Sequence, residues 1–177
     1  MEIVSSVHPT VIIIGLGNPI LGDDGVGWRV AEMVAQELRM TTSSQLIPPI
    51  SESHPLVAEI EVECMAVGGL ALMERLIGYE RAIIIDAIST GQQPIGAVTQ
   101  FALSDLPDHA LGHLCSAHDT TLQNALRLGR TMGAKIPDEI IIVGIEIQPV
   151  FDFSDELTPN TLDSIPKAFE VVMELLK

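Results

Sequence analysis

Two adjacent carboxylates in a glycine-rich turn are the residues of this chain best suited to chemistry. Asp23 and Asp24 lie in the stretch Gly15–Gly27, which directly follows the apolar run Val11–Ile14. A strand followed by a glycine-rich turn and a helix start forms a ligand site in α/β proteins, and its usual ligand is a phosphate. Because two carboxylates repel a phosphate, the turn favours a cation instead.

The glycine pattern itself argues against a nucleotide. A dinucleotide fingerprint needs glycine at its first, third and sixth positions, which here are Gly15, Gly17 and Ile20. No acidic residue closes the second strand at the expected place, and the Gly-Lys-Ser/Thr of a P-loop is absent. Nucleotide binding remains an alternative, which predicts stabilisation by NAD or ATP and none by a divalent metal.

One of the two aspartates has an ordinary structural explanation. A carboxylate at a helix start accepts backbone N–H groups and is stabilised by the helix dipole. That role explains one aspartate but not both, and it leaves Gly25 and Gly27 unexplained, since each costs a helix about 1 kcal/mol relative to alanine. We therefore predict one aspartate as a cap and the other as a ligand, with a second backbone or a ligand close to the glycines.

Two further residues complete a candidate ligand set. Asp86 follows the apolar run Ala82–Ile85, at the edge where α/β sheets bind ligands, and a buried carboxylate there needs a cation or several donors. His118 follows Ser116, a candidate helix cap, so we predict it in a first helical turn, where the positive helix end keeps the imidazole neutral. Two carboxylates and a neutral imidazole suit Zn²⁺, Ni²⁺ or a similar ion and leave coordination positions open, as in catalytic sites.

The remaining reactive residues indicate no other chemistry. The sequence has no Gly-x-Ser-x-Gly elbow, so a Ser-His-Asp hydrolase is not indicated. Cys64 and Cys115 lie far apart, in no metal-type spacing, and two cysteines do not make a disulfide scaffold. We expect Cys64 to lie in the core and the protein to be reduced and cytoplasmic.

The composition excludes several kinds of partner. The 177 residues carry 24 acidic and nine basic side chains, a net charge of −15, without a cluster of Lys or Arg. Such a charge disfavours both a phosphate backbone and an anionic membrane. No apolar run approaches the roughly 20 residues of a membrane span, and residues 1–8 lack the basic region of a signal peptide. We expect no nucleic acid or membrane partner, and a monomer with a single domain over residues 1–177.

The elements that must position these residues alternate between strands and helices. Continuous β-branched runs, typical of parallel strands covered on both faces, occur at Val11–Leu16, Ala82–Ile85 and Ile140–Ile147. Two further strands are predicted at Glu61–Val67 and Ala97–Leu103. Helices are predicted at Trp28–Leu38, Leu70–Ile77, His118–Met132 and Thr158–Leu176. This alternation indicates an α/β fold, either doubly wound or a three-layer sandwich.

The same residues predict details of three segments. Thr158 is expected to cap the last helix with Pro159 at its first position, and Pro166 predicts a kink or two short helices. The stretch Ile47–Pro55 is predicted to be a proline-rich loop. Apolar side chains expected on one face of the first helix are Val30, Met33, Val34 and Leu38.

Together, these motifs resemble the nickel–iron hydrogenase maturation endopeptidases. The matching stretches, in chain order, are Gly15–Gly27, Gly68-Gly69, Ile85-Asp86-Ala87, Ser116-Ala117-His118, Val143-Gly144-Ile145 and Leu157-Thr158-Pro159. The resemblance implies a twisted, mostly parallel sheet of about five strands with helices on both faces. It also implies a cytoplasmic endopeptidase that removes the C-terminal extension of a hydrogenase large-subunit precursor after nickel insertion.

The resemblance assigns roles to individual residues. The nickel ligands of the family match Asp24, Asp86 and His118, which are therefore the candidate catalytic and metal-binding residues. Asp23 matches a neighbouring acid that orients the loop, and we also test it as a candidate base. The nickel is supplied by or shared with the substrate, and zinc or cadmium can occupy such a site. Many relatives carry an acidic residue and a threonine where this chain has Val67–Leu70, so only the backbone turn matches there.

Two other functions fit the same residues. A nickel-binding maturation chaperone without peptidase activity would hold metal and leave the mass of the precursor unchanged. A protease of the same fold with another protein substrate would cleave regardless of nickel. For the endopeptidase, we predict that the proline-rich loop and the segment Leu106–Cys115 dock the precursor, because loops at the strand-end edge carry specificity.

Overall fold

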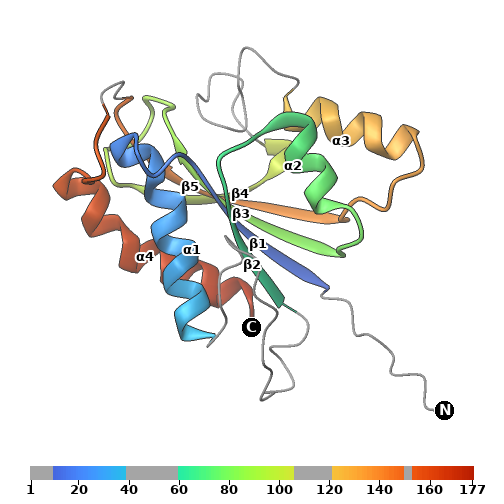
Figure 1. Cartoon of the computed structure of the whole chain (residues 1–177). Helices are drawn as coiled ribbons and strands as arrows, with labels where there is room; N and C mark the ends of the chain where they lie inside the picture. The colour runs from blue at the N-terminus through green and yellow to red at the C-terminus, as the bar shows by residue number, and fades with distance from the viewer. Residues whose placement is uncertain (1–9, 39–59, 106–120, 150–152) are drawn as a thin grey trace.

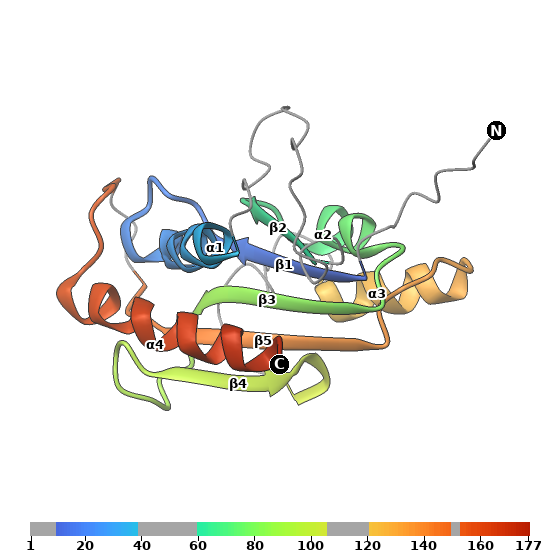
Figure 2. The same ribbon diagram turned by 90° about the horizontal axis from the view of Figure 1, so that it is seen from below.

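A single mixed sheet forms the centre of the computed structural model, which describes residues 10–38, 60–105, 121–149 and 153–177. Its strands lie in the order β2-β1-β3-β5-β4 (Figure 1). β1 pairs in parallel with β2 and β3, and β3 with β5, whereas β4 runs antiparallel to β5 at one edge (Figure 2). The strand bounds are β1 Val11–Leu16, β2 Ile60–Met65, β3 Arg81–Ile88, β4 Val98–Ala102 and β5 Glu139–Glu146.

Helices cover both faces of this sheet. In the described part of the chain they are α1 Val26–Glu37, α2 Gly69–Leu76, α3 Leu122–Thr131 and α4 Pro159–Leu175, with short 3₁₀ turns η1 Gly22–Gly25 and η3 Leu103–Asp105. α1 packs with α4 on one face and α2 with α3 on the other (Figure 1). The predicted three-layer α/β fold with a mostly parallel sheet of five strands is confirmed. No helix among the described residues is both long and apolar enough to cross a membrane.

Each face of the sheet has its own apolar cluster. Neighbouring residues of a strand point to opposite faces, so Ile13 lies in the cluster with α1 and α4, and Ile14 in the cluster with α2 and α3. Both side chains are fully buried. The same division holds for Ile83 and Ile84 in β3. Strands buried on both faces need continuous apolar runs, which is why these two were recognisable in the sequence.

The sheet order creates a switch point between β1 and β3. The chain leaves β1 through α1 toward β2 on one side, and leaves β3 toward β4 and β5 on the other. At the carboxyl ends of two such neighbouring strands, the connections diverge, and α/β sheets bind ligands in the crevice between them. Asp24 follows β1, and Asp86 lies near the end of β3.

Glycines bring the start of α1 against these two strand ends. A Cβ on Gly27 would lie 2.3 Å from the carbonyl oxygen of Leu16 and 2.5 Å from that of Ile85. Gly17 has a φ of +131°, and a Cβ there would lie 1.9 Å from the carbonyl oxygen of Asp24. A Cβ on Gly25 would lie 2.8 Å from the Cα atom of Pro19. Gly25 and Gly27 therefore face other backbone segments, which was one of the two predicted alternatives. The contact leaves α1 and the turn before it directly over the ends of β1 and β3.

Two helix predictions need correction. α1 begins at Val26, and Met33 is 36% exposed while Ala31 is fully buried, so the apolar face is rotated from the predicted one. α3 begins at Leu122, because Thr121 accepts a hydrogen bond from the backbone N–H of Asn124 at 3.3 Å and caps the helix there. The predicted start of this helix at residue 118 is therefore wrong.

α4 also differs from its prediction, because it is one continuous helix of 17 residues rather than two short ones. Thr158 is its N-cap residue and Pro159 its first residue, as predicted. Pro166 and Leu162, the residue four positions earlier, are both exposed, so water can bond the carbonyl group that the proline leaves unpaired. Burial of apolar side chains on the opposite side, at Ile165, Ala168 and Val172, holds the helix on the sheet.

Candidate functional site

Asp24 lies in a turn that is closed by local hydrogen bonds. It belongs to η1, is half-buried, and accepts a hydrogen bond at Oδ2 from the backbone N–H of Asn18 at 2.7 Å. The carbonyl oxygen of Asn18 in turn accepts from the N–H of Leu21 at 3.0 Å. η1 contacts β3. The carboxylate of Asp24 is thus fixed within a turn that lies against the strand carrying Asp86.

Asp23 binds different partners from its neighbour Asp24. Its side chain is 3% exposed, and its two oxygens accept hydrogen bonds from Thr158, Oδ1 from the backbone N–H and Oδ2 from Oγ1, each at 2.7 Å. Thr158 is the N-cap residue of α4. We predicted that one aspartate caps the helix that follows this turn. This is wrong, because the N-cap residue of α1 is Gly25 and no side chain caps the helix. Asp23 instead binds the start of a helix far away in sequence.

Asp86 is a fully buried carboxylate in β3. The strand continues past it to Ile88, three residues beyond the predicted end at Ile85. Gly15 pairs with Ile85, so Asp86 lies level with Leu16, where β1 ends. An ionised carboxylate in such a position needs donors or a cation nearby.

The direction of Asp86 follows from the alternation along β3. It shares a face with Ile84, which belongs to the cluster covered by α2 and α3. Leu122, the first residue of α3, belongs to that cluster and comes four positions after His118 in the sequence. His118 itself, together with Cys115 and the segments 47–55 and 106–115 predicted as loops, lies outside the described residues. In the described ranges alone, no group of three or more His, Cys, Asp or Glu residues could hold a metal ion.

Sequence reasoning missed a third buried carboxylate at this edge of the sheet. Glu146, the last residue of β5, is 2% exposed. Its Oε1 accepts from the backbone N–H groups of Thr90 and Gly91 at 2.7 and 2.8 Å, and its Oε2 accepts from Thr90 Oγ1 at 2.7 Å. It holds the connection that follows β3. The sequence did contain a signal for this site, because Glu146 interrupts the apolar run Ile140–Ile147. Asp86 was recognised from a similar position, directly after an apolar run.

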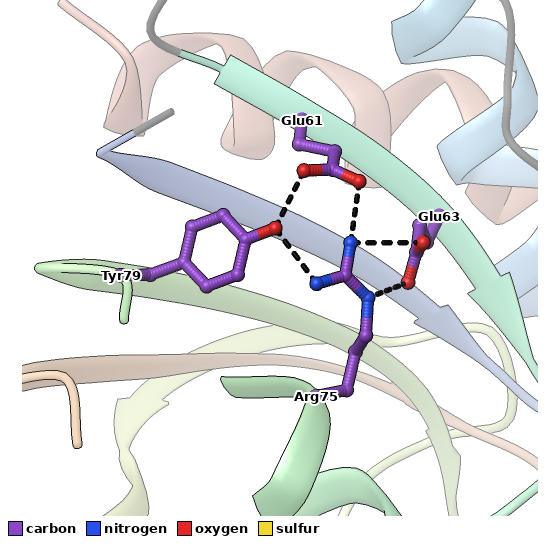
Figure 3. A network of polar contacts seen from close by, with 4 residues as sticks. All are labelled: Glu61, Glu63, Arg75 and Tyr79. Carbon is purple, nitrogen blue, oxygen red and sulfur yellow. Dashed lines mark hydrogen bonds and ion pairs between the residues drawn. The ribbon is translucent and has the colours of Figure 1, made fainter. Parts of the chain in front are cut away.

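A second pair of carboxylates on the edge strand β2 was also missed (Figure 3). Glu61 and Glu63 are two residues apart and so point to one face, where Arg75 of α2 forms ion pairs with both. Nη1 of Arg75 donates to the hydroxyl oxygen of Tyr79 at 2.8 Å, and that hydroxyl donates to Glu61. Burial, together with the hydrogen bond to Glu61, raises the pKa of Tyr79 to about 12. These carboxylates share a guanidinium group, and their evident role is to join α2 to β2.

The thiol of Cys64 is unsuited to nucleophilic chemistry. The residue is half-buried against the cluster of α1 and α4, close to its predicted place in the core. Burial raises the pKa of the thiol to about 12, and the charges of Glu32 and Glu63 act in the same direction. A thiol is reactive as its thiolate, which is scarce here at neutral pH.

The fold and the edge residues define a class of α/β protein with carboxylates gathered at the switch point of its sheet. A family model described as hydrogenase maturation protease matches residues 66–175, more than half of the chain. The chain therefore belongs to the hydrogenase maturation protease family. Members are endopeptidases, and this chain is accordingly an enzyme that processes a hydrogenase precursor.

Individual relatives agree with this family. The chain is 23% identical over 168 residues to the hydrogenase expression/formation protein HupD of Thiocapsa roseopersicina, covering 95% of this chain and 68% of that protein. Its fold is similar to that of the hydrogenase maturating endopeptidase HybD from E. coli, with a TM-score of 0.64 and 20% identity over 94% of this chain and 91% of the other. It also resembles the NiFe hydrogenase maturation protease HybD from Thermococcus kodakarensis, with a TM-score of 0.61 and 23% identity, over 94% and 99% of the two chains.

Proposed function

We propose that this endopeptidase removes the C-terminal extension of a hydrogenase large-subunit precursor after nickel insertion. In this proposal Asp24, Asp86 and His118 recognise the nickel that the precursor carries. The nickel is part of the substrate. The observation that carries the proposal is the fully buried carboxylate of Asp86 beside the acidic turn, at the switch point of the sheet.

The donor set supports this assignment chemically. Carboxylate oxygens and a neutral imidazole nitrogen suit divalent ions such as Ni²⁺ and Zn²⁺, and three ligands leave positions for groups of the substrate. Two of the three ligands lie on elements that contact each other at this edge of the sheet. Asp24 lies in η1, where it accepts a hydrogen bond, and Asp86 lies in β3. The third, His118, precedes a helix that packs on the same face as Asp86. Zinc or cadmium should therefore also bind these residues in vitro.

Dependence on nickel gives the reaction its specificity. The protein residues form only part of a coordination sphere, so a complete site exists only when a correctly loaded precursor is bound. A metal ion held there would polarise the scissile carbonyl group or lower the pKa of an attacking water molecule. We further propose that the enzyme acts as a monomer in the cytoplasm.

The test is the intact mass of a nickel-loaded large-subunit precursor after incubation with the enzyme. Asp24→Ala, Asp86→Asn and His118→Ala should each abolish the loss of a C-terminal peptide, whereas Asp163→Ala, a change at an exposed position of α4, should not. Asp86→Asn keeps the shape of a buried side chain, and thermal melting shows that each variant is folded.

The alternatives predict other results. Cleavage of nickel-free precursor would identify a protease with a different recognition mode. An unchanged precursor mass, with nickel still bound to the wild-type chain, would favour the maturation chaperone.

A further inference from the structure

We propose that Asp23 is a positioning residue, which holds the turn carrying Asp24 by binding Thr158, and that it is not the base of the hydrolysis. The inference rests on the proposed role of Asp24 in recognising nickel. It adds a second residue, Thr158, to the parts of the chain on which activity depends.

The two residues form a clamp between segments 135 positions apart in the sequence. Both oxygens of Asp23 are used by one residue, and the bonds come from a backbone N–H and a hydroxyl group. The backbone strengthens the same junction. The N–H of Gly22 donates to the carbonyl oxygen of Ser154 at 2.6 Å, and the N–H of Ser154 donates to that of Ile20 at 3.0 Å.

The position of Asp23 also argues against a catalytic base. The carboxylate lies at the N-terminal end of α4, where the positive end of the helix dipole favours a negative charge. A general base must accept a proton from water or substrate within hydrogen-bond reach. Both oxygens of Asp23 instead accept hydrogen bonds from Thr158, and its side chain is only 3% exposed, so it offers no accessible acceptor to water or substrate. This geometry suits a residue that holds the turn in place.

The clamp affects Asp24 directly, because Asp23 and Asp24 are joined by a peptide bond in the same turn. η1 has only four residues and is held on one side by Asn18, whose N–H donates to Asp24, and on the other by Thr158 through Asp23. Metal ligands must lie within a few tenths of an ångström of their working distances. Loosening one side of the turn should thus displace the carboxylate of Asp24 without removing it.

Thr158→Val separates a positioning role from a catalytic one. The change removes the bond from Oγ1 to Asp23 and the 3.2 Å contact between Oγ1 and Thr161 Oγ1, and it keeps the bond from the backbone N–H. It removes no helix cap, since this side chain makes none. We expect kcat/KM for the nickel-loaded precursor to fall about tenfold, the effect of one charge-assisted hydrogen bond, and Thr158→Ser to restore it. Thr131→Val is the matched control, because its exposed hydroxyl bonds within α3, and it should leave activity unchanged.

A double variant shows whether Asp23 acts through Thr158. If it does, Asp23→Asn combined with Thr158→Val loses about as much activity as Asp23→Asn alone, since coupled residues are not additive. If Asp23 is the base, Asp23→Asn costs about 10²- to 10⁴-fold. In that case Thr158→Val leaves kcat unchanged. That pattern would overturn the inference.

Amide hydrogen exchange tests the clamp independently of any substrate. Exchange at Asn18 and along residues 17–25 should be about tenfold faster in Thr158→Val than in the wild type, while exchange in α3 is unchanged. If the wild type cleaves no precursor, the proposed function fails, but the exchange result still decides whether the clamp exists. Equal exchange in the two proteins would contradict the clamp even if the enzyme is active.

Discussion

At the scale of single residues, the buried carboxylates of this protein differ in the donors around them. Asp23 accepts two hydrogen bonds and Glu146 three from nearby backbone and hydroxyl groups, which gives both a structural role. Asp24 and Asp86 lie at the switch point, where in the proposed function they bind the nickel of the precursor. Under the proposed function, the same side-chain chemistry serves folding in one place and recognition of nickel in another.

The role of Glu146 gives a prediction at this scale. Glu146→Gln replaces one acceptor oxygen by an amide that faces the donors of Thr90, so the free energy of unfolding should fall by about 1–3 kcal/mol. Urea denaturation measures the change. Glu170→Gln, at an exposed position of α4, should alter stability by less than about 0.5 kcal/mol. Equal stability of Glu146→Gln and the wild type would show that the connection after β3 does not need this anion.

At the scale of elements, a polar network joins a helix to a strand where few apolar residues are buried. The edge strand β2 has fewer buried residues than β1 or β3, and α2 is tied to it by the network of Arg75 with Glu61, Glu63 and Tyr79 (Figure 3). Such partly exposed networks contribute modestly to stability. Their main effect here is to fix the position of α2 relative to the sheet edge.

The hydroxyl of Tyr79 makes the attachment of α2 sensitive to alkaline pH. Burial raises its pKa from 10.0 to about 12, so between these values the unfolded chain loses a proton that the folded protein keeps. The folded state then binds more protons, and the free energy of unfolding falls as pH rises through this window. Tyr79→Phe should make this fall shallower when urea denaturation is followed at several alkaline pH values. A slope unchanged by Tyr79→Phe would contradict the assignment.

At the scale of the whole molecule, the site depends on how closely α1 approaches the sheet. The carbonyl oxygens of Leu16 and Ile85 both lie against Gly27, so the helix start, the acidic turn and two strand ends form one packed unit. Interiors of this density transmit displacements rather than absorb them. The geometry of the candidate site is therefore a property of the assembled sheet and helix together.

A single methyl group should disturb that unit. Gly27→Ala places a Cβ 2.3 Å from a backbone oxygen that cannot move independently, and we expect destabilisation of about 3 kcal/mol or more with loss of nickel-dependent cleavage. Gly129→Ala is the matched control. Its Cβ would meet the flexible side chain of Met73 at 2.9 Å, and in a helix the change should cost less than about 1 kcal/mol. Similar melting temperatures for the two variants would contradict the role of Gly27.

Local patterns in the sequence were sufficient to predict that these strands and helices exist and in which order they occur. The bounds of β1 and the start of α4 at Pro159 were predicted as they occur. A strand buried on both faces shows a continuous apolar run in the sequence, and the fixed φ of proline favours the first position of a helix. Predictions failed where two local signals competed. Thr121 rather than Ser116 precedes α3, and the exposed position of Pro166 let α4 continue.

The sequence by itself determined the α/β alternation, the apolar cores of the central strands and the presence of carboxylates after β1 and in β3. Only the tertiary structure decided which of them are neighbours and what each carboxylate binds. The pairing of Asp23 with Thr158 and that of Glu146 with Thr90 join segments 135 and 56 residues apart. Periodicity reports the environment of a residue along its own helix or strand. Partners across such distances are set by the order of the strands and the faces to which the connecting helices pack.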